Sequence, residues 1–162
     1  RKENKGIFKK KLIEECANGR DCEEIPDGSF VVQPGGSQMS PDFLIKEQGK
    51  LYFVECKSSK TTKKPTYNSK LPPSNYIYIF CSAAVQANQT TFFLGEDIIS
   101  EEDRKKMEDF KSELQILVKT FNATLDKSHI TWYTRAMYNA HGNYFSDDVR
   151  IDRERRVMEA LK

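Results

Sequence analysis

The sequence predicts an α/β domain in which a central mixed β-sheet is flanked by helices, and three observations carry this prediction. Apolar alternation over 43–56, broken by a Gln-Gly pair, predicts an antiparallel hairpin. The β-branched and aromatic run 75–81 predicts an interior strand covered on both faces. Apolar residues spaced by three and four over 101–121 predict an amphipathic helix. The whole chain, 1–162, is long enough for one domain with a real core.

Composition limits the class of protein. A net charge of +2 is too small to indicate nucleic-acid binding by itself, so any argument for it depends on how the charges are distributed. No apolar run approaches the ~20 residues that span a bilayer, and the N-terminus has no signal-peptide core. The four cysteines lack CxxC spacing, which indicates reduced thiols. We therefore expect a soluble, cytoplasmic protein without a membrane partner. Because residue 1 is Arg, we expect a processed chain or one cut from a longer protein.

The N-terminal part predicts a helix and a strand. Residues 6–18 place apolar side chains on one side of a helix that Gly19 would end. Glu15 falls at the edge of that side, whereas Glu14 points away from it. Glu15 is therefore either a carboxylate held near the core or a boundary residue with a long stem. A short strand is expected over 29–33.

The hairpin holds the main candidate site. Its expected strands are 43–46 and 51–56, and alternation turns Glu55 and Lys57 to the same face. A two-residue loop would place Asp42 opposite Glu55, with Cβ atoms about 4.5–5.5 Å apart. Like charges this close repel unless a cation lies between them, so the pattern suggests a hard-metal site. A slip of one residue would turn one carboxylate to the other face.

A basic stretch follows the hairpin. Residues 58–74 contain no acid, are rich in Ser, Thr and Asn, and include four lysines: Lys60, Lys63, Lys64 and Lys70. Such a loop beside a metal site is where phosphates are expected. The alternative is a solvated, flexible loop. Tyr67, Asn68 and a Pro-Pro pair favour a fixed shape.

The C-terminal part predicts two helices and a strand. Ser100 would cap the helix 101–121, whose apolar stripe we expect to pack in the core. The stripe consists of Met107, Phe110, Leu114, Leu117 and Phe121. A strand is expected over 128–135 and a charged helix over 147–162.

Other kinds of site find little support. A zinc site would need two unrelated pairs to converge, and neither pair has a standard spacing. The four residues are Cys16, Cys22, His129 and His141. A Cys or Ser nucleophile would need one of the two histidines, which fit structural or surface roles better. A second Pro-Asp pair ends in Asp27 and is interpreted as an ordinary turn, because no ExK follows it.

Pro41-Asp42 followed by Glu55-Cys56-Lys57 resembles the signature of the PD-(D/E)XK nuclease superfamily. The basic loop leading into 75–81 also resembles a region of some type II restriction endonucleases. The resemblance implies a restriction-endonuclease-like core over about residues 6–121. It also implies one or two Mg²⁺ ions, replaceable by Mn²⁺, on Asp42, Glu55 and the Cys56 carbonyl. Lys57 would orient or activate the attacking water, and Glu15, or else Glu14, would be the helix carboxylate.

The expected function is that of a prokaryotic, Mg²⁺-dependent endonuclease of the restriction type that hydrolyses phosphodiester bonds of double-stranded DNA. Cutting both strands needs two active sites or two visits by one site, so we expect a homodimer by default. The residues expected to contact DNA are Lys60, Lys63, Lys64, Tyr67, Asn68 and Lys70. One alternative is a repair or recombination nuclease that reads DNA structure, and another is a DNA-binding module without catalysis. If the resemblance is fortuitous, Asp42 caps a turn and Glu55 and Lys57 form an exposed pair.

One element of the superfamily core has no counterpart in the sequence pattern. The core places a helix between its third and fourth strands, but the prolines in 58–74 make a poor helix. The fourth strand is therefore either 75–81, reached through an irregular crossover, or 128–135, reached through the helix 101–121.

Overall fold

The computed structural model describes residues 2–3, 25–35, 39–68, 70–85, 89–125, 127 and 129–162. The expected first helix, with Glu14 and Glu15, lies outside the described residues. The described elements, in chain order, are β1 (Lys2–Glu3), β2 (Ser29–Val32), β3 (Phe43–Glu47), β4 (Lys50–Ser59), β5 (Thr66–Asn68), β6 (Tyr76–Ser82), β7 (Thr90–Leu94), the 3₁₀-helix η1 (Gly95–Asp97), α2 (Glu101–Asn122), β8 (Met137–Asn139) and α3 (Asp147–Ala160).

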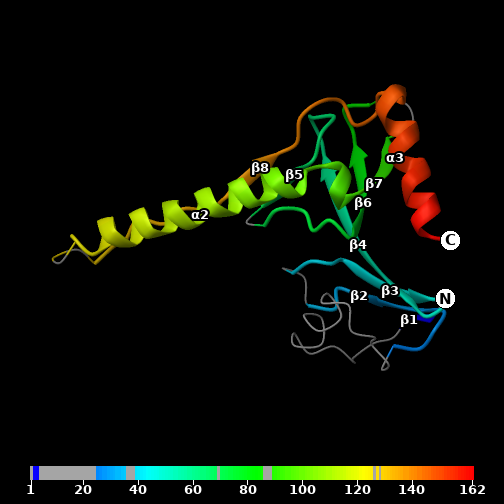
Figure 1. Cartoon of the computed structure of the whole chain (residues 1–162), viewed down its shortest axis with the longest axis horizontal. Helices are drawn as coiled ribbons and strands as arrows, with labels where there is room; N and C mark the ends of the chain where they lie inside the picture. The colour runs from blue at the N-terminus through cyan, green and yellow to red at the C-terminus, as the bar shows by residue number, and fades with distance from the viewer. Residues whose placement is uncertain are drawn as a thin grey trace.

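The main sheet is mixed and has the strand order β1-β2-β3-β4-β6-β7, which confirms the α/β class (Figure 1). Strands β2, β3 and β4 form an antiparallel meander. Strand β6 then runs parallel to β4, and β7 returns antiparallel to β6. The strands predicted over 29–33, 43–46, 51–56 and 75–81 are all present, as β2, β3, β4 and β6.

The hairpin has the two-residue loop that the sequence predicts. Gln48 and Gly49 both have positive φ angles, 52° and 75°, and Glu47 pairs with Lys50. Two positive φ angles match the twist of the flanking strands. The pairing runs to Phe43 opposite Val54, and continuing it by one step places Asp42 opposite Glu55.

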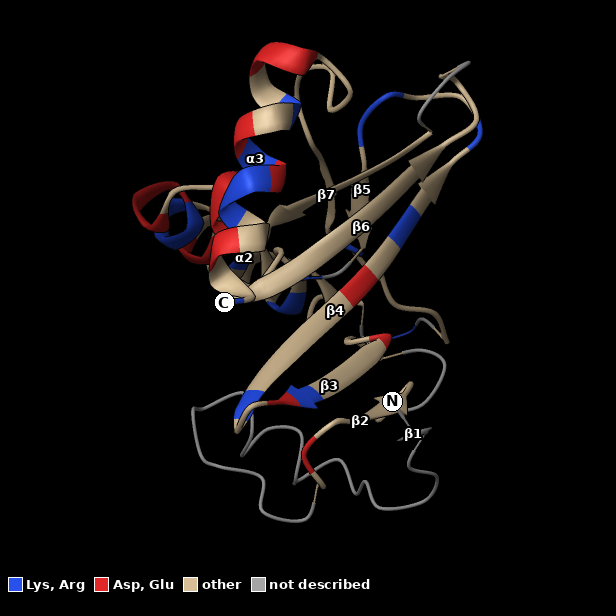
Figure 2. Ribbon diagram, turned by 90° about the vertical axis from the view of Figure 1, so that its right-hand side faces the viewer, with Lys and Arg blue, Asp and Glu red and all other residues tan. Residues whose placement is uncertain are grey.

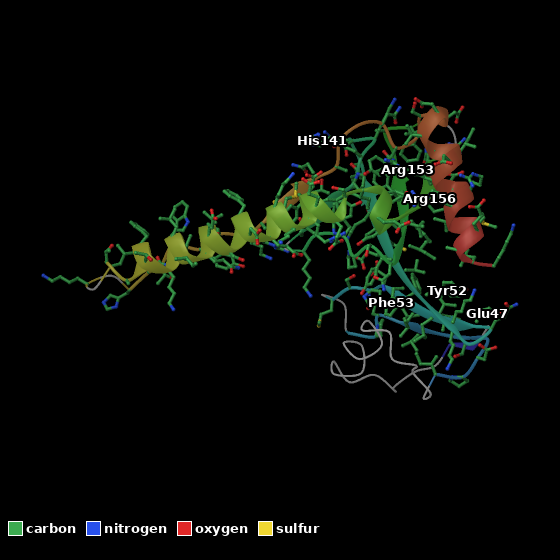
Figure 3. All side chains as sticks on the ribbon, viewed as in Figure 1. Glu47, Tyr52, Phe53, His141, Arg153 and Arg156 are labelled. Atoms are coloured by element: carbon green, nitrogen blue, oxygen red, sulfur yellow. The ribbon has the colours of Figure 1, made fainter. Side chains whose placement is uncertain are left out.

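The sheet is covered on both faces. One face carries an aromatic core in which Phe53 stacks on Tyr76 with ring centroids 5.2 Å apart, and the small β5–β8 sheet covers it. The other face carries Tyr52 and Val54 and packs against Val157 of α3, which lies along this face (Figure 3). Adjacent residues of β4 thus enter different cores, as strand alternation requires.

Of the two segments considered for the fourth strand, 75–81 forms β6, which lies next to β4 in the sheet. The chain reaches β6 through an irregular crossover. That crossover contains β5, which pairs with β8 at residues 137–139. The predicted strand over 128–135 is wrong, because the described residues 129–135 form no strand. They run back along α2 instead, where the Asn122 amide makes two hydrogen bonds with the backbone of Trp132, of 2.8 and 2.7 Å.

Helix α2 begins as predicted but does not pack as predicted. The Ser100 hydroxyl accepts a hydrogen bond from the backbone N–H of Asp103 at 3.1 Å. No residue of the helix is buried, and Phe110 and Leu117 are 65% and 66% exposed, so the expectation of core packing is wrong. The physical reason is that α2 runs beyond the sheet as a projecting arm (Figure 1).

Helix α3 is joined to the sheet by polar contacts as well as by Val157. Arg156 pairs with Glu96 and with Asp97, whose side chain is almost fully buried. The Thr91 hydroxyl donates to Glu154 at 2.8 Å. Within the described ranges, no helix combines the length and apolar character needed to cross a membrane.

Gly95 gives a test of the packing that sets the start of β6. A Cβ at this position would lie 1.8 Å from the Pro73 carbonyl oxygen, so the two backbone segments would have to separate. We expect Gly95→Ala to lower the free energy of unfolding by about 1–3 kcal/mol, the usual cost of overpacking. Urea denaturation would measure it, with Asn75→Ala in the facing loop as control. An unchanged midpoint for Gly95→Ala would contradict the close approach.

Candidate active site

Two acidic residues, Asp42 and Glu55, lie at the open end of the hairpin. Asp42 precedes β3, and its Oδ2 accepts a hydrogen bond of 2.7 Å from the backbone N–H of Cys56. This bond holds the Asp42 side chain against β4, one residue beyond Glu55. Because Phe43 pairs with Val54, the observed register places both acidic residues just beyond this last pair, as predicted.

Glu55 is a buried carboxylate with only part of its charge compensated. The residue is 8% exposed, and its Oε1 accepts from Lys57 Nζ at 2.6 Å. Its Oε2 is buried and has no hydrogen-bond partner. Leaving a buried polar atom unpaired costs roughly 1–3 kcal/mol, and more for a charged group. Such an atom in a folded protein calls for an explanation, and an ion that binds there would provide one.

Aromatic side chains form the wall beside Glu55. Tyr78 is its neighbour on β6, and burial, followed by the charge of Glu55, raises the pKa of Tyr78. Burial also raises the pKa of Tyr76; a hydrogen bond with the Ser40 side chain opposes that rise, and the charge of Glu55 adds to it. Both phenols stay neutral at physiological pH. The carboxylates thus face a low-dielectric surface, on which charge interactions are stronger than in water.

The pKa of the Cys56 thiol is affected by the negative charge around it. Partial desolvation raises its pKa, and the charges of Asp42 and Glu55 raise it further, while Lys57 acts in the opposite direction. Figure 2 shows that beyond the hairpin β4 consists of uncharged residues apart from one acidic and one basic segment. Negative charge therefore accumulates at this point of the strand, with Lys57 as its nearby compensation.

The residues present fit a hard cation. Asp42, Glu55 and the Cys56 carbonyl offer the oxygen ligands that Mg²⁺ prefers, and Mg²⁺ commonly binds through one or two carboxylates plus waters and phosphate. The orphaned Glu55 Oε2 is the observation that favours an ion here. No cluster of three or more His, Cys, Asp or Glu side chains suited to a metal occurs in the described ranges. The expected third carboxylate, Glu15 or Glu14, lies outside them.

The basic loop has a defined shape beside this site. Its turn is fixed by a hydrogen bond of 3.0 Å from the Thr62 N–H to Ser59 Oγ, and by one of 2.6 Å from Ser82 Oγ to the Thr62 carbonyl. The Tyr144 N–H also donates to the Lys63 carbonyl at 3.0 Å. The expected contact residues Lys60, Lys63, Asn68 and Lys70 are exposed, and Lys64 is half-buried.

Tyr67 is placed differently from the other expected DNA contacts. It is 3% exposed, and its ring meets the ring of Tyr78 edge to face, with centroids 5.5 Å apart. Its buried hydroxyl has no hydrogen-bond partner. The structure therefore makes Tyr67 part of the aromatic core under the site, so its side chain does not reach the protein surface.

Several residues around the site were not singled out from the sequence. Tyr76 and Tyr78 alternate within the run 75–81, but only the parallel pairing of β6 with β4 shows which of them face Glu55. Asp27 also has a definite place, because its Oδ1 accepts from the Gly49 N–H at 2.8 Å. It secures the hairpin turn, in keeping with the turn role predicted for it. His129 and His141 are exposed, and Cys16 and Cys22 lie outside the described residues.

Metal binding should appear in thermal stability without any assay of catalysis. An ion that binds only the folded chain stabilises it, and at 100 times its Kd the gain corresponds to a Tm rise of roughly 5–10 °C. We expect this rise with Mg²⁺ for the wild type and its loss in Glu55→Gln. Glu113→Gln, at an exposed position of helix α2, is the matched control and should respond like the wild type. An equal response from Glu55→Gln would place the ion elsewhere.

Comparisons with known proteins give no family for this chain: no protein-family model, curated protein or solved structure matches it. The case for a function therefore depends on the residues and geometry described above.

Proposed function

We propose that this protein is a Mg²⁺-dependent endonuclease that hydrolyses phosphodiester bonds of double-stranded DNA, with a site of the PD-(D/E)XK type. One observation carries the proposal. Asp42 and Glu55 both lie at the open end of the hairpin, where Lys57 compensates one oxygen of Glu55 and the other oxygen is buried without a partner. Two carboxylates and a lysine in one region support a site of this type.

Each group has a role in phosphodiester hydrolysis. Asp42 and Glu55, with the Cys56 carbonyl, would hold Mg²⁺, which supplies positive charge at the phosphate and lowers the pKa of water. Lys57 stands at the exposed side of Glu55 and is 26% exposed, so its ammonium can turn toward a phosphate or the attacking water. There it donates a hydrogen bond and stabilises the charge that develops in the transition state. The attack would be in line with the leaving oxygen.

The sheet around the site supports the same proposal. Three antiparallel strands, β2 to β4, are followed by the parallel strand β6, and the signature lies on the central pair. The crossover between β4 and β6 is an ordered basic loop in place of the helix expected from the superfamily core. That replacement puts lysines close to the strand that carries Glu55 and Lys57.

Two other functions make different use of the same surface. A repair or recombination nuclease would keep the chemistry but prefer branched or flapped DNA. A DNA-binding module would use the basic loop without cleavage. The paired carboxylates favour a nuclease, because a module that only binds phosphates gains nothing from burying negative charge beside them.

Plasmid digestion tests the proposal directly. With Mg²⁺ we expect discrete fragments for the wild type and a rate at least about 100-fold lower for Asp42→Asn and Lys57→Ala, the scale seen when an electrostatic catalytic group is removed. Asp109→Asn makes the same change at an exposed position of the projecting helix α2, so it is the matched control and should cut normally. Full cleavage by Asp42→Asn would refute the site, and binding without cleavage in Mg²⁺ or Mn²⁺ would favour the binding module.

The basic loop makes a separate prediction about salt. Removing one phosphate-binding cation lowers the slope of log K against log salt by about 0.9. We expect the double variant Lys60→Gln/Lys63→Gln to bind DNA more weakly and to reduce this slope by about 2, as titrations by fluorescence anisotropy would measure. A double variant on α2, Lys105→Gln/Lys119→Gln, changes charge equally and should leave the slope unchanged. Equal slopes for both variants would remove the loop from the interface.

A further inference from the structure

Helix α2 and the return segment 129–136 form a long arm that leaves the sheet (Figures 1 and 3). The arm carries large apolar side chains along its length in solvent. Among them Phe110 and Leu117 are 65% and 66% exposed. Monomeric proteins rarely expose a continuous apolar patch of this kind, and such patches mark interaction surfaces.

The apolar stripe of α2 has the spacing of a helix–helix seam. Its members, Met107, Phe110, Leu114, Leu117 and Phe121, follow intervals of three and four residues. Two apolar positions in seven make a narrow seam for another helix, whereas a helix that covers a core usually shows a wider face. The spacing therefore points to a helix as the occupant.

The return segment leaves most of this stripe exposed. Leu114 is half-buried, as are Arg104, Lys111, Val118 and Asn122, which follow a neighbouring line of the helix. At 100° per residue that line is centred well away from Phe110 and Leu117. The segment adds apolar surface of its own, because Ile130, Trp132 and Tyr133 are 78%, 60% and 80% exposed.

We propose that the arm is a dimerisation surface, in which the stripe of α2 packs antiparallel against the same stripe of a second copy of this chain. A self-complementary surface is what a two-fold dimer uses. DNA is a poor occupant, since phosphates need cations and the stripe has none. The inference stands on the exposed stripe and does not depend on the nuclease chemistry.

The available area favours a second copy. A helix of 22 residues is about 33 Å long and roughly 10 Å wide, so the strip it offers is about 330 Å². The segment beside it roughly doubles this, which approaches the ~800 Å² per partner of a standard interface. Charge does not oppose the packing, because the acids of the first turn already pair with Arg104 and Lys106 within the helix.

Sedimentation of the full chain, without DNA or divalent ions, tests the inference. We expect a mass twice the 18.7 kDa of one chain for the wild type. Leu117→Glu should weaken the dimer by about 100-fold, as expected when a charge replaces a central apolar side chain. Ile116→Glu is the matched control, because Ile116 is also 66% exposed but points away from the stripe. It should leave the dimer intact.

Three outcomes would overturn the inference: a monomeric wild type at about 50 μM, a Leu117→Glu chain that remains dimeric, or equal dissociation by Ile116→Glu. Phe110→Glu is a second stripe variant and should behave like Leu117→Glu, with circular dichroism to show that both remain folded. Failure of DNA cleavage would leave these masses unchanged, so the two proposals fail separately.

The orientation has its own check. Lys106 and Thr120 each precede a stripe residue and flank the same side of it at opposite ends of α2. We expect a mixture of Lys106→Cys and Thr120→Cys chains to form mixed disulfides faster than either chain alone forms its own, relative to the unsubstituted chain. Absence of this preference for mixed disulfides would refute the antiparallel arrangement.

Discussion

The register of the β3–β4 hairpin is the constraint on which the candidate site depends. Strand side chains alternate between faces, so a slip of one residue would separate Asp42 from Glu55. Positive φ angles at Gln48 and Gly49 fix the length of the turn at one end. At that end Asp27 also binds the Gly49 N–H, and at the open end the Cys56 N–H binds Asp42. The hairpin is therefore held at both ends, and the two carboxylates have little freedom to part.

The site lies where β4 changes partners. Up to Val54 the strand pairs with β3 on one edge, and from Phe53 onward it pairs with β6 on the other. Glu55 lies one residue beyond the last pair with β3, and on that edge of β4 the next backbone N–H binds the Asp42 side chain. The opposite edge of β4 stays paired with β6, which keeps the strand rigid. The edge of β4 that β3 leaves unpaired gives a ligand access to the carboxylates, and the edge paired with β6 holds them in position. Both access and fixed position are required for metal or phosphate chemistry.

Local signals made much of this predictable, and topology decided the rest. The Gln-Gly turn, the run 75–81 and the Ser100 cap are properties of neighbouring residues, and these three predicted features are present. The placement of Tyr67 was not predictable in this way, because its polar surroundings in the sequence resemble an exposed loop. Only the pairing of β5 with β8 buries it against Tyr78. The short strands β5 and β8 also gain their structure from each other, across about 70 residues of chain.

The arm shows that the apolar periodicity of a helix does not by itself predict whether its apolar side is buried. Spacings of three and four residues predict which side of α2 is apolar, but they do not say whether a sheet or another helix lies opposite. In this chain α3 packs on one face of the sheet and the β5–β8 pair on the other, and α2 covers neither. A helix excluded from both faces must either expose its stripe or bury it against another molecule. Exposure of Phe110 and Leu117 in a lone chain would be costly, since burial of each such side chain contributes about 1.5–3 kcal/mol, and association is the remaining way to recover that free energy.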